Sequence, residues 1–183
     1  VIASLDTDTI TQTAEAAARE KVTAAVEANR ETVEEAVRKA VQEEVTAQVT
    51  SAVRENVLAQ VLSTMQMMAE QYEAGVAAGA IDTATQEKLN AALDAQMASE
   101  TVTATISAKT EEQMNADTVK ALIAAKTEEQ MTALIEKNMA SDEVHTQLNA
   151  ALESAKSGVA SIVALRDQLD SYNTFYVGLQ QYT

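Results

Sequence analysis

Residues 33–61 read VEEAVRKAVQEEVTAQVTSAVRENVLAQV, with a valine at every fourth position and mostly charged or polar residues between. The same spacing joins Val22 to Val26 earlier in the chain. Positions four apart lie on one side of an α-helix, whereas a half-buried β-strand needs apolar residues at every second position. Four residues turn a helix by about 400°, so the row drifts about 40° around the helix at each step. The pattern therefore predicts a long helix that buries successive faces against more than one neighbour.

The composition favours a chain made of helices alone. Alanine, the strongest helix former, is the commonest residue, and the 183 residues include no proline. There is no cysteine, which excludes thiol chemistry, disulfides and zinc sites built on cysteine. We expect an all-α fold, either an elongated bundle of long helices or a coiled-coil-like hairpin.

We expect a single elongated helical region over residues 1–183. Thr9 begins a capping-box spacing, which predicts a first helix over about residues 10–74. Glycines near its end predict a turn over residues 75–82, and further helices are expected over 83–183. Polar residues that suit helix starts mark further boundaries at Ser99, residues 115–117 and Ser141.

Two short words recur in the chain. Residues 108–114 and 125–131 both read AKTEEQM, and residues 89–93 and 148–152 both read LNAAL. The offsets of 17 and 59 residues share no period. We interpret these repeated segments as the result of helices built from few residue types, with one local duplication, and not as a solenoid with a fixed repeat.

The C-terminal part has a different apolar period, with spacings of four and three that alternate through five heptads. A period of 3.5 residues keeps one seam facing a partner helix and favours left-handed supercoiling. The predicted helix-packing seam consists of Val144, Leu148, Ala151, Ala155, Gly158, Ile162, Leu165, Leu169, Tyr172, Tyr176 and Leu179. The small residues in it suit a close approach of two helices. The pattern leaves open whether the seam closes within one chain or between chains of a homo-oligomer.

The charge restricts the partners. A formal net charge of −15 repels nucleic acid and anionic lipid surfaces, so we expect no nucleic-acid binding.

The longest apolar stretch, residues 74–81, is far shorter than the roughly 20 residues that cross a bilayer. The sequence starts with Val1 and not with Met, so we expect a processed form or a piece of a longer protein.

Residues that could carry chemistry are few. His145 is the only histidine, and Asp142 and Glu143 beside it could help it to bind a metal. An exposed helix start accounts for the same residues more simply, because acidic side chains suit the positive end of a helix dipole. Adjacent carboxylates, as in the Glu-Glu pairs at residues 111–112 and 128–129, diverge by about 100° on a helix and indicate a solvated surface.

Two further segments have alternative interpretations. Residues 6–8, Asp-Thr-Asp, could hold a cation loosely but lack the glycine and terminal glutamate of a calcium loop. Met65, Met67, Met68 and Tyr72 form either an adaptable binding surface or, as we favour, core beneath a turn. With no phosphate-binding glycine loop either, we expect no catalytic, cofactor-binding or metal site.

The C-terminal end resembles a known family. Leucine heptads that include Leu165 and Leu169, followed by Tyr176-x-Gly178-Leu179-x-x-Tyr182-Thr183, are similar to the heptad repeats of the bacterial phage infection protein (YhgE/Pip) family. The resemblance covers about 20 residues. That family is related to phage-receptor and type VII secretion accessory membrane proteins. Its members carry a long helical extracytoplasmic region between an N-terminal transmembrane helix and a C-terminal membrane domain.

The resemblance implies that this chain is part of such a stalk, on the extracytoplasmic face of a cell membrane. Membrane attachment is then expected through segments outside this sequence, and phage or secretion components are the expected protein partners. The family offers no catalytic residues to transfer. We therefore expect a non-enzymatic helical stalk that acts in phage adsorption, as an export accessory or in surface interaction. The alternative is an intracellular coiled-coil adaptor or chaperone-like protein that binds a client; an acidic metal-dependent enzyme is a distant third.

Overall fold

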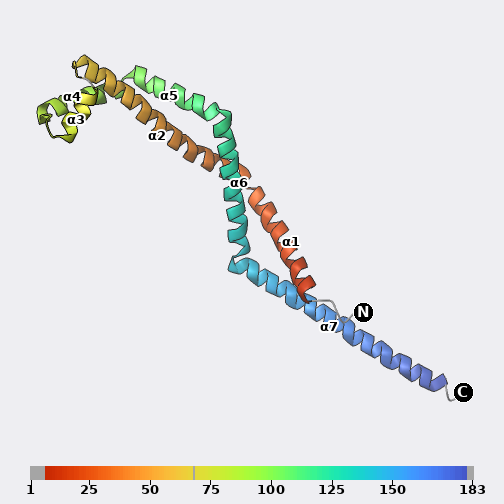
Figure 1. The fold of residues 1–183 in the computed structure, drawn as a ribbon. Helices are drawn as coiled ribbons and strands as arrows, with labels where there is room; N and C mark the ends of the chain where they lie inside the picture. The colour runs from red at the N-terminus through yellow and green to blue at the C-terminus, as the bar shows by residue number, and fades with distance from the viewer. Residues whose placement is uncertain (1–6, 68, 181–183) are drawn as a thin grey trace. The chain divides into compact units, whose positions relative to one another are not determined.

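The computed structural model describes residues 7–67 and 69–180, and their side chains except at positions 7, 69, 159 and 170–180. Over these residues the fold is all-α, as the sequence predicts, and contains no strand. The helices are α1 (Thr7–Glu27), α2 (Arg30–Thr64), α3 (Ala69–Ala77), α4 (Thr83–Met97), α5 (Glu100–Asn115), α6 (Asp117–Met139) and α7 (Asp142–Gln180) (Figure 1).

The helices belong to two compact units, where a single region was expected. The first unit comprises the described residues within Val1–Arg30 and Glu129–Thr183, and the second comprises those within Glu31–Glu128. The chain passes between the units twice, at the start of α2 after Arg30 and inside α6 after Glu128. Each unit has its own apolar packing.

The second unit is built around α2. The valines spaced by four along it are buried, with 1–7% of their surface exposed, which confirms the predicted buried row. They are Val37, Val41, Val45, Val49, Val53, Val57 and Val61. Full burial of one valine contributes roughly 1.5–3 kcal/mol before the entropy of folding is counted, so this row is the main apolar element of the unit.

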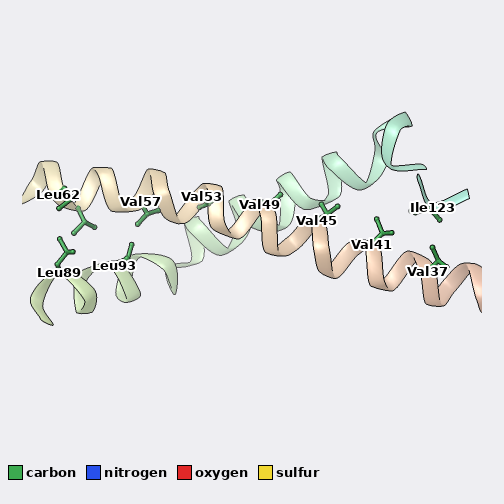
Figure 2. Packing of buried hydrophobic residues seen from close by; sticks show 11 residues of the cluster. Val37, Val41, Val45, Val49, Val53, Val57, Leu62, Leu89, Leu93 and Ile123 are labelled. Atoms are coloured by element: carbon green, nitrogen blue, oxygen red, sulfur yellow. The ribbon is translucent and has the colours of Figure 1, made fainter. Parts of the chain in front are cut away.

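Helices α4, α5 and the start of α6 cover successive parts of that row. Leu89 and Leu93 of α4 lie opposite the end of the row near Leu62, and Ile123 of α6 lies beside Val37 at the other end (Figure 2). Val102 and Ile106 of α5 pack against the same cluster. A row that drifts about 40° at each step cannot face one straight neighbour along its whole length, so several short helices share it.

Two ion pairs show that the covering helices run antiparallel to α2. Arg54 Nη2 lies 4.0 Å from Asp94 Oδ1 of α4, and Lys126 Nζ of α6 lies 3.8 Å from Glu44 Oε2. From Asp94 to Lys126 the chain moves forward, while the partner on α2 moves back from Arg54 to Glu44, so the two arms run in opposite directions. The unit is a helical hairpin in which α2 forms one arm.

The first unit pairs α1 with the start of α7. The apolar row of α1 is also spaced by four, with Ile10, Ala14, Ala18 and Val22 half-buried and Val26 buried. α1 contacts α7 and lies beside its first part in Figure 1. Arg19 of α1 also pairs with Glu136 near the end of α6, so α1 contacts both helices.

The single helix expected over residues 10–74 is instead three helices, α1 to α3. The first break follows α1, where the Asn29 side-chain Nδ2 donates to the Ala25 carbonyl (3.0 Å) and satisfies one of the free acceptors of a helix end. The second break is a Schellman turn after α2, in which Met67 N donates to Leu62 O (2.8 Å). Its left-handed residue is Gln66, at φ 57°, and not the glycine that usually marks such a turn.

The turn predicted over residues 75–82 is shorter than expected, because α3 includes Gly75 and ends at Ala77. Gly79 takes φ 65°, and Ala80 N donates to Gly75 O (2.8 Å), which again forms a Schellman turn. The helix starts predicted near residue 83, at Ser99, at residues 115–117 and at Ser141 are confirmed, whereas the first helix begins earlier than expected, because Thr9 lies within α1. Asp82 caps α4 and Ser99 caps α5 with side-chain oxygens that accept from Thr85 N and Val102 N, and α6 and α7 begin at Asp117 and Asp142.

Candidate functional site

The hollow that contains the only histidine lies in the first unit, between α1, the end of α6 and the start of α7. Its volume is about 490 Å³, and it is lined by Gln12, Glu15, Ala16, Arg19, Met139, His145 and Leu148. His145 is exposed in the first turn of α7, with Asp142 and Glu143 beside it. Ser141 Oγ accepts from Val144 N (3.4 Å) at the same helix start. These contacts are those of an ordinary exposed helix start.

The cation of the hollow is already paired. Arg19 Nη1 donates to Glu136 Oε1 at 2.7 Å. This hydrogen bond and the attraction between the two charges raise the pKa of Arg19 and hold the pKa of Glu136 below its ordinary value. The nearby charge of Glu15 also raises the pKa of Arg19. A compensated arginine offers little net charge to an anionic ligand.

The remaining charged candidates are not gathered into a site. Within residues 7–67 and 69–180, no group of three or more His, Asp or Glu side chains is placed to hold a metal ion. Asp6 lies outside the described residues, and Asp8 lies in the first turn of α1. The Glu-Glu pairs at residues 111–112 and 128–129 are exposed. None of the described helices contains an apolar stretch long enough to cross a lipid bilayer.

The methionine group is divided between core and surface. Met67 and Tyr72 pack against the core cluster of the second unit, as the interpretation of core beneath a turn expects. Met65 is 36% exposed, and Met68 lies outside the described residues.

The sequence-predicted seam of α7 divides into three parts in the structure. The half-buried members are Val144, Leu148 and Ala155. The exposed members are Ala151, Gly158, Ile162, Leu165 and Leu169. The members whose side chains lie outside the described residues are Tyr172, Tyr176 and Leu179.

The part of the seam next to α1 differs from the prediction at one position. Leu152 is half-buried where the heptad pattern expected Ala151, so the half-buried positions Val144, Leu148 and Leu152 continue a spacing of four. The repeated word LNAAL was the signal for this, because its first copy supplies the buried pair Leu89 and Leu93. The second copy supplies Leu148 and Leu152 in the same way.

The large side chains further along α7 form an exposed strip, which we define as Ile162, Leu165 and Leu169. Their exposed fractions are 52%, 59% and 67%. A Cβ added at Gly158, just before the strip, would meet no atom within 4 Å, so the close helix approach expected at this glycine is not made within the described chain. Three large apolar side chains on one face of a helix form a surface suited to another apolar surface.

Comparison of the chain with models of protein families, with curated proteins and with solved structures finds no match.

Proposed function

We propose that this chain is a non-enzymatic helical stalk that acts by presenting helix surfaces to other proteins. The observation that carries the proposal is the exposed strip on α7, a helix of 39 residues and hence about 58 Å in length. The apolar rows of α1 and α2 pack within their own units, whereas this strip is exposed in the described chain. The hollow beside His145 gives little support to an enzyme, because its arginine is compensated by Glu136.

We further propose that the stalk lies on the extracytoplasmic face of a bacterial cell membrane, where it serves phage adsorption, export or surface interaction. Support comes from the resemblance of residues 165–183 to the phage infection protein family. The net charge of −15 agrees with this role, since it favours protein partners over nucleic acid.

Protease treatment of intact cells tests the location. Cells that express the full-length gene with a tag inside this region are exposed to protease, with a cytoplasmic protein followed as the control. The proposal expects digestion of the tagged region while the cytoplasmic control stays intact. Protection of the tagged region until the cells are lysed would favour the intracellular adaptor instead.

A matched pair of variants tests the role of the strip. Leu165→Gln with Leu169→Gln should lower phage adsorption or export, whichever the deletion of the gene affects, because polar side chains remove the apolar surface. Leu122→Gln on α6 is the control, since this leucine is also exposed, by 42%, but lies outside the strip. Equal effects of the strip and control variants would contradict the proposal.

A further inference from the structure

The half-buried members of the predicted seam end at Ala155, before the strip begins, although Val163 beside the strip is half-buried. Leu148 and Ala155 are half-buried in the part of α7 that α1 accompanies. Ile162 and Leu169 occupy the next two equivalent heptad positions and are exposed by 52% and 67%. Figure 1 shows α7 continuing past the N-terminal end of α1. Ile162 and Leu169 therefore continue a row that is half-buried earlier in α7, whereas Leu165 continues the exposed row of Ala151 and Gly158.

The residues beside the strip permit two helices of the same charge to meet. The positions that flank a heptad seam here are Ser161, Arg166 and Gln168, all exposed and none acidic. Asp167 points its Oδ1 at Arg166 Nη2 (3.0 Å) and lies outside these flanking positions. In a chain with a net charge of −15, the positions that flank the seam here thus carry no carboxylate to repel a second copy.

The spacing of the strip selects its partner. The rows of α1, α2 and α6 are spaced by four and drift around their helices, so each follows a seam with a period of 3.5 over a short length only, as α1 does at the start of α7. A 3.5-residue row fits best against another of its own kind, in which each helix supplies both knobs and holes. Ile162 and Leu165 are the β-branched and leucine pair typical of such seams. The same row continues in sequence to Tyr172, Tyr176 and Leu179.

We propose that a second copy of this chain covers the strip, so that the C-terminal part of α7 forms an intermolecular coiled coil. Gly158, beside which a Cβ would meet no atom within 4 Å, lies at the start of this interface. The partner helix would pack against α7 from this point on, in place of α1. Self-association through the strip does not depend on the proposed location of the protein, and its test uses the purified chain alone.

Sedimentation equilibrium of the full 183-residue chain tests this proposal over a concentration range of about a thousandfold. The average mass is expected to rise with concentration from that of one chain toward that of a dimer. Leu165→Gln with Leu169→Gln should weaken association by at least about 100-fold, because two polar groups would be buried at the seam. Leu122→Gln should associate like the natural sequence, since this exposed leucine lies outside the strip.

Circular dichroism of the same samples shows whether the variants remain folded, and Ile162→Gln replaces the double variant if that one loses helix. If the natural chain stays monomeric over the whole range, the proposal is overturned. The strip would then contact a different protein or solvent. Association of the double variant at the natural strength would also overturn it, since the contact would then lie elsewhere. Neither result bears on where the protein acts, which the protease experiment tests separately.

Discussion

The valine row of α2 and the seam of α7 are both regular apolar rows on long helices, yet they differ sharply in burial. The valines from Val37 to Val61 are 1–7% exposed, whereas Ile162, Leu165 and Leu169 are 52–67% exposed. The difference follows their spacing, which is four in α2 and alternates between three and four in α7. Spacing thus separates the rows that this chain buries by itself from the one that it leaves open.

The physical reason lies in how helices pack. Side chains four apart form ridges that are inclined to the helix axis, and helices packed through such ridges cross at an angle. Each neighbour then covers only a short part of the row, which suits short helices such as α4 and α5 on a long one such as α2. A 3.5-residue seam runs almost parallel to the axis and needs one long partner. α1 accompanies only the first part of α7, so it is not that partner along the whole helix.

The repeated words show the same rule inside the second half of the chain. Thr110 and Thr127 occupy the same place in the two copies of AKTEEQM, and both are buried. The methionine four residues later is half-buried at Met114 and buried at Met131. The local duplication therefore repeats a buried threonine followed four residues later by a methionine that is half-buried in the first copy and buried in the second.

The largest expected effect comes from the end of the buried row. Leu62→Ala or Leu89→Ala should each lower the free energy of unfolding by about 2–5 kcal/mol, because each leucine is 1% exposed and its removal leaves a cavity. Urea unfolding followed by circular dichroism measures the loss. Leu122→Ala, at an exposed leucine of α6, is the control and should cost far less. Similar losses for all three would mean that the second unit has no core of the kind described.

The two halves of α7 should differ in the same experiment. Leu148→Ala should cost about 1–2 kcal/mol because this side chain is half-buried against α1, whereas Leu165→Ala in dilute solution should stay within about 0.5 kcal/mol. Dilution matters because it keeps chains apart. A loss of about 2–5 kcal/mol for Leu165→Ala at the lowest concentration would show that the strip is buried within a single chain.

Much of this contrast can be read from the sequence. The valine row, the all-α fold and the helix starts at Asp82 and Ser99 follow from local rules that hold wherever the chain packs. The break at Gln66 could not be predicted, because the usual signal for a left-handed turn residue is glycine or asparagine and here the turn uses glutamine.

The position of the half-buried seam depends on tertiary packing as well. Leu152 rather than Ala151 is half-buried in the part of α7 next to α1, whose own apolar row is spaced by four, while Ala155 keeps its predicted seam position. Heptad counting alone assigns the smaller residue. The pairing of Arg19 with Glu136 joins residues that are 117 positions apart, and no local pattern in the sequence signals it.

A buried polar atom offers a way to strengthen the row of four. Thr110 is 7% exposed, and its Oγ1 has no hydrogen-bond partner among the described residues, whereas Thr127 Oγ1 donates to Ile123 O at 2.8 Å. Thr110→Val should therefore raise the free energy of unfolding by about 1 kcal/mol, since it removes an unsatisfied group and keeps the shape. Thr127→Val removes a made hydrogen bond and should give no such gain. Urea unfolding compares the two, and equal effects would contradict the difference between these sites.

A smaller gain is expected where the seam becomes exposed. Gly158→Ala should stabilise α7 by about 0.5–1 kcal/mol, because alanine restricts the unfolded chain and its Cβ meets open space. Thermal unfolding of a dilute sample measures the gain. Gly79→Ala is the contrasting variant and should destabilise the protein, because Gly79 has φ 65°. A loss at Gly158 would mean that a neighbouring helix lies closer than the structure shows.

The smallest expected effect concerns the ion pair that joins α1 to α6 and so helps to keep α1 over the first half of the seam. Because the folded protein holds the pKa of Glu136 below its ordinary value, the pair adds stability above the ordinary carboxyl range and loses it as the pH falls through the lowered pKa. Acidification below about pH 4.5 should therefore weaken the packing of α1 on its neighbours, and amide exchange should rise first in α1 and in the covered part of α7.

Glu136→Gln should remove this pH dependence, and Arg19→Gln should do the same, since either change breaks the one contact. The two changes together should add little to either alone. Additive effects would show that the two groups act separately, and α1 would then be held over α7 by its apolar row alone.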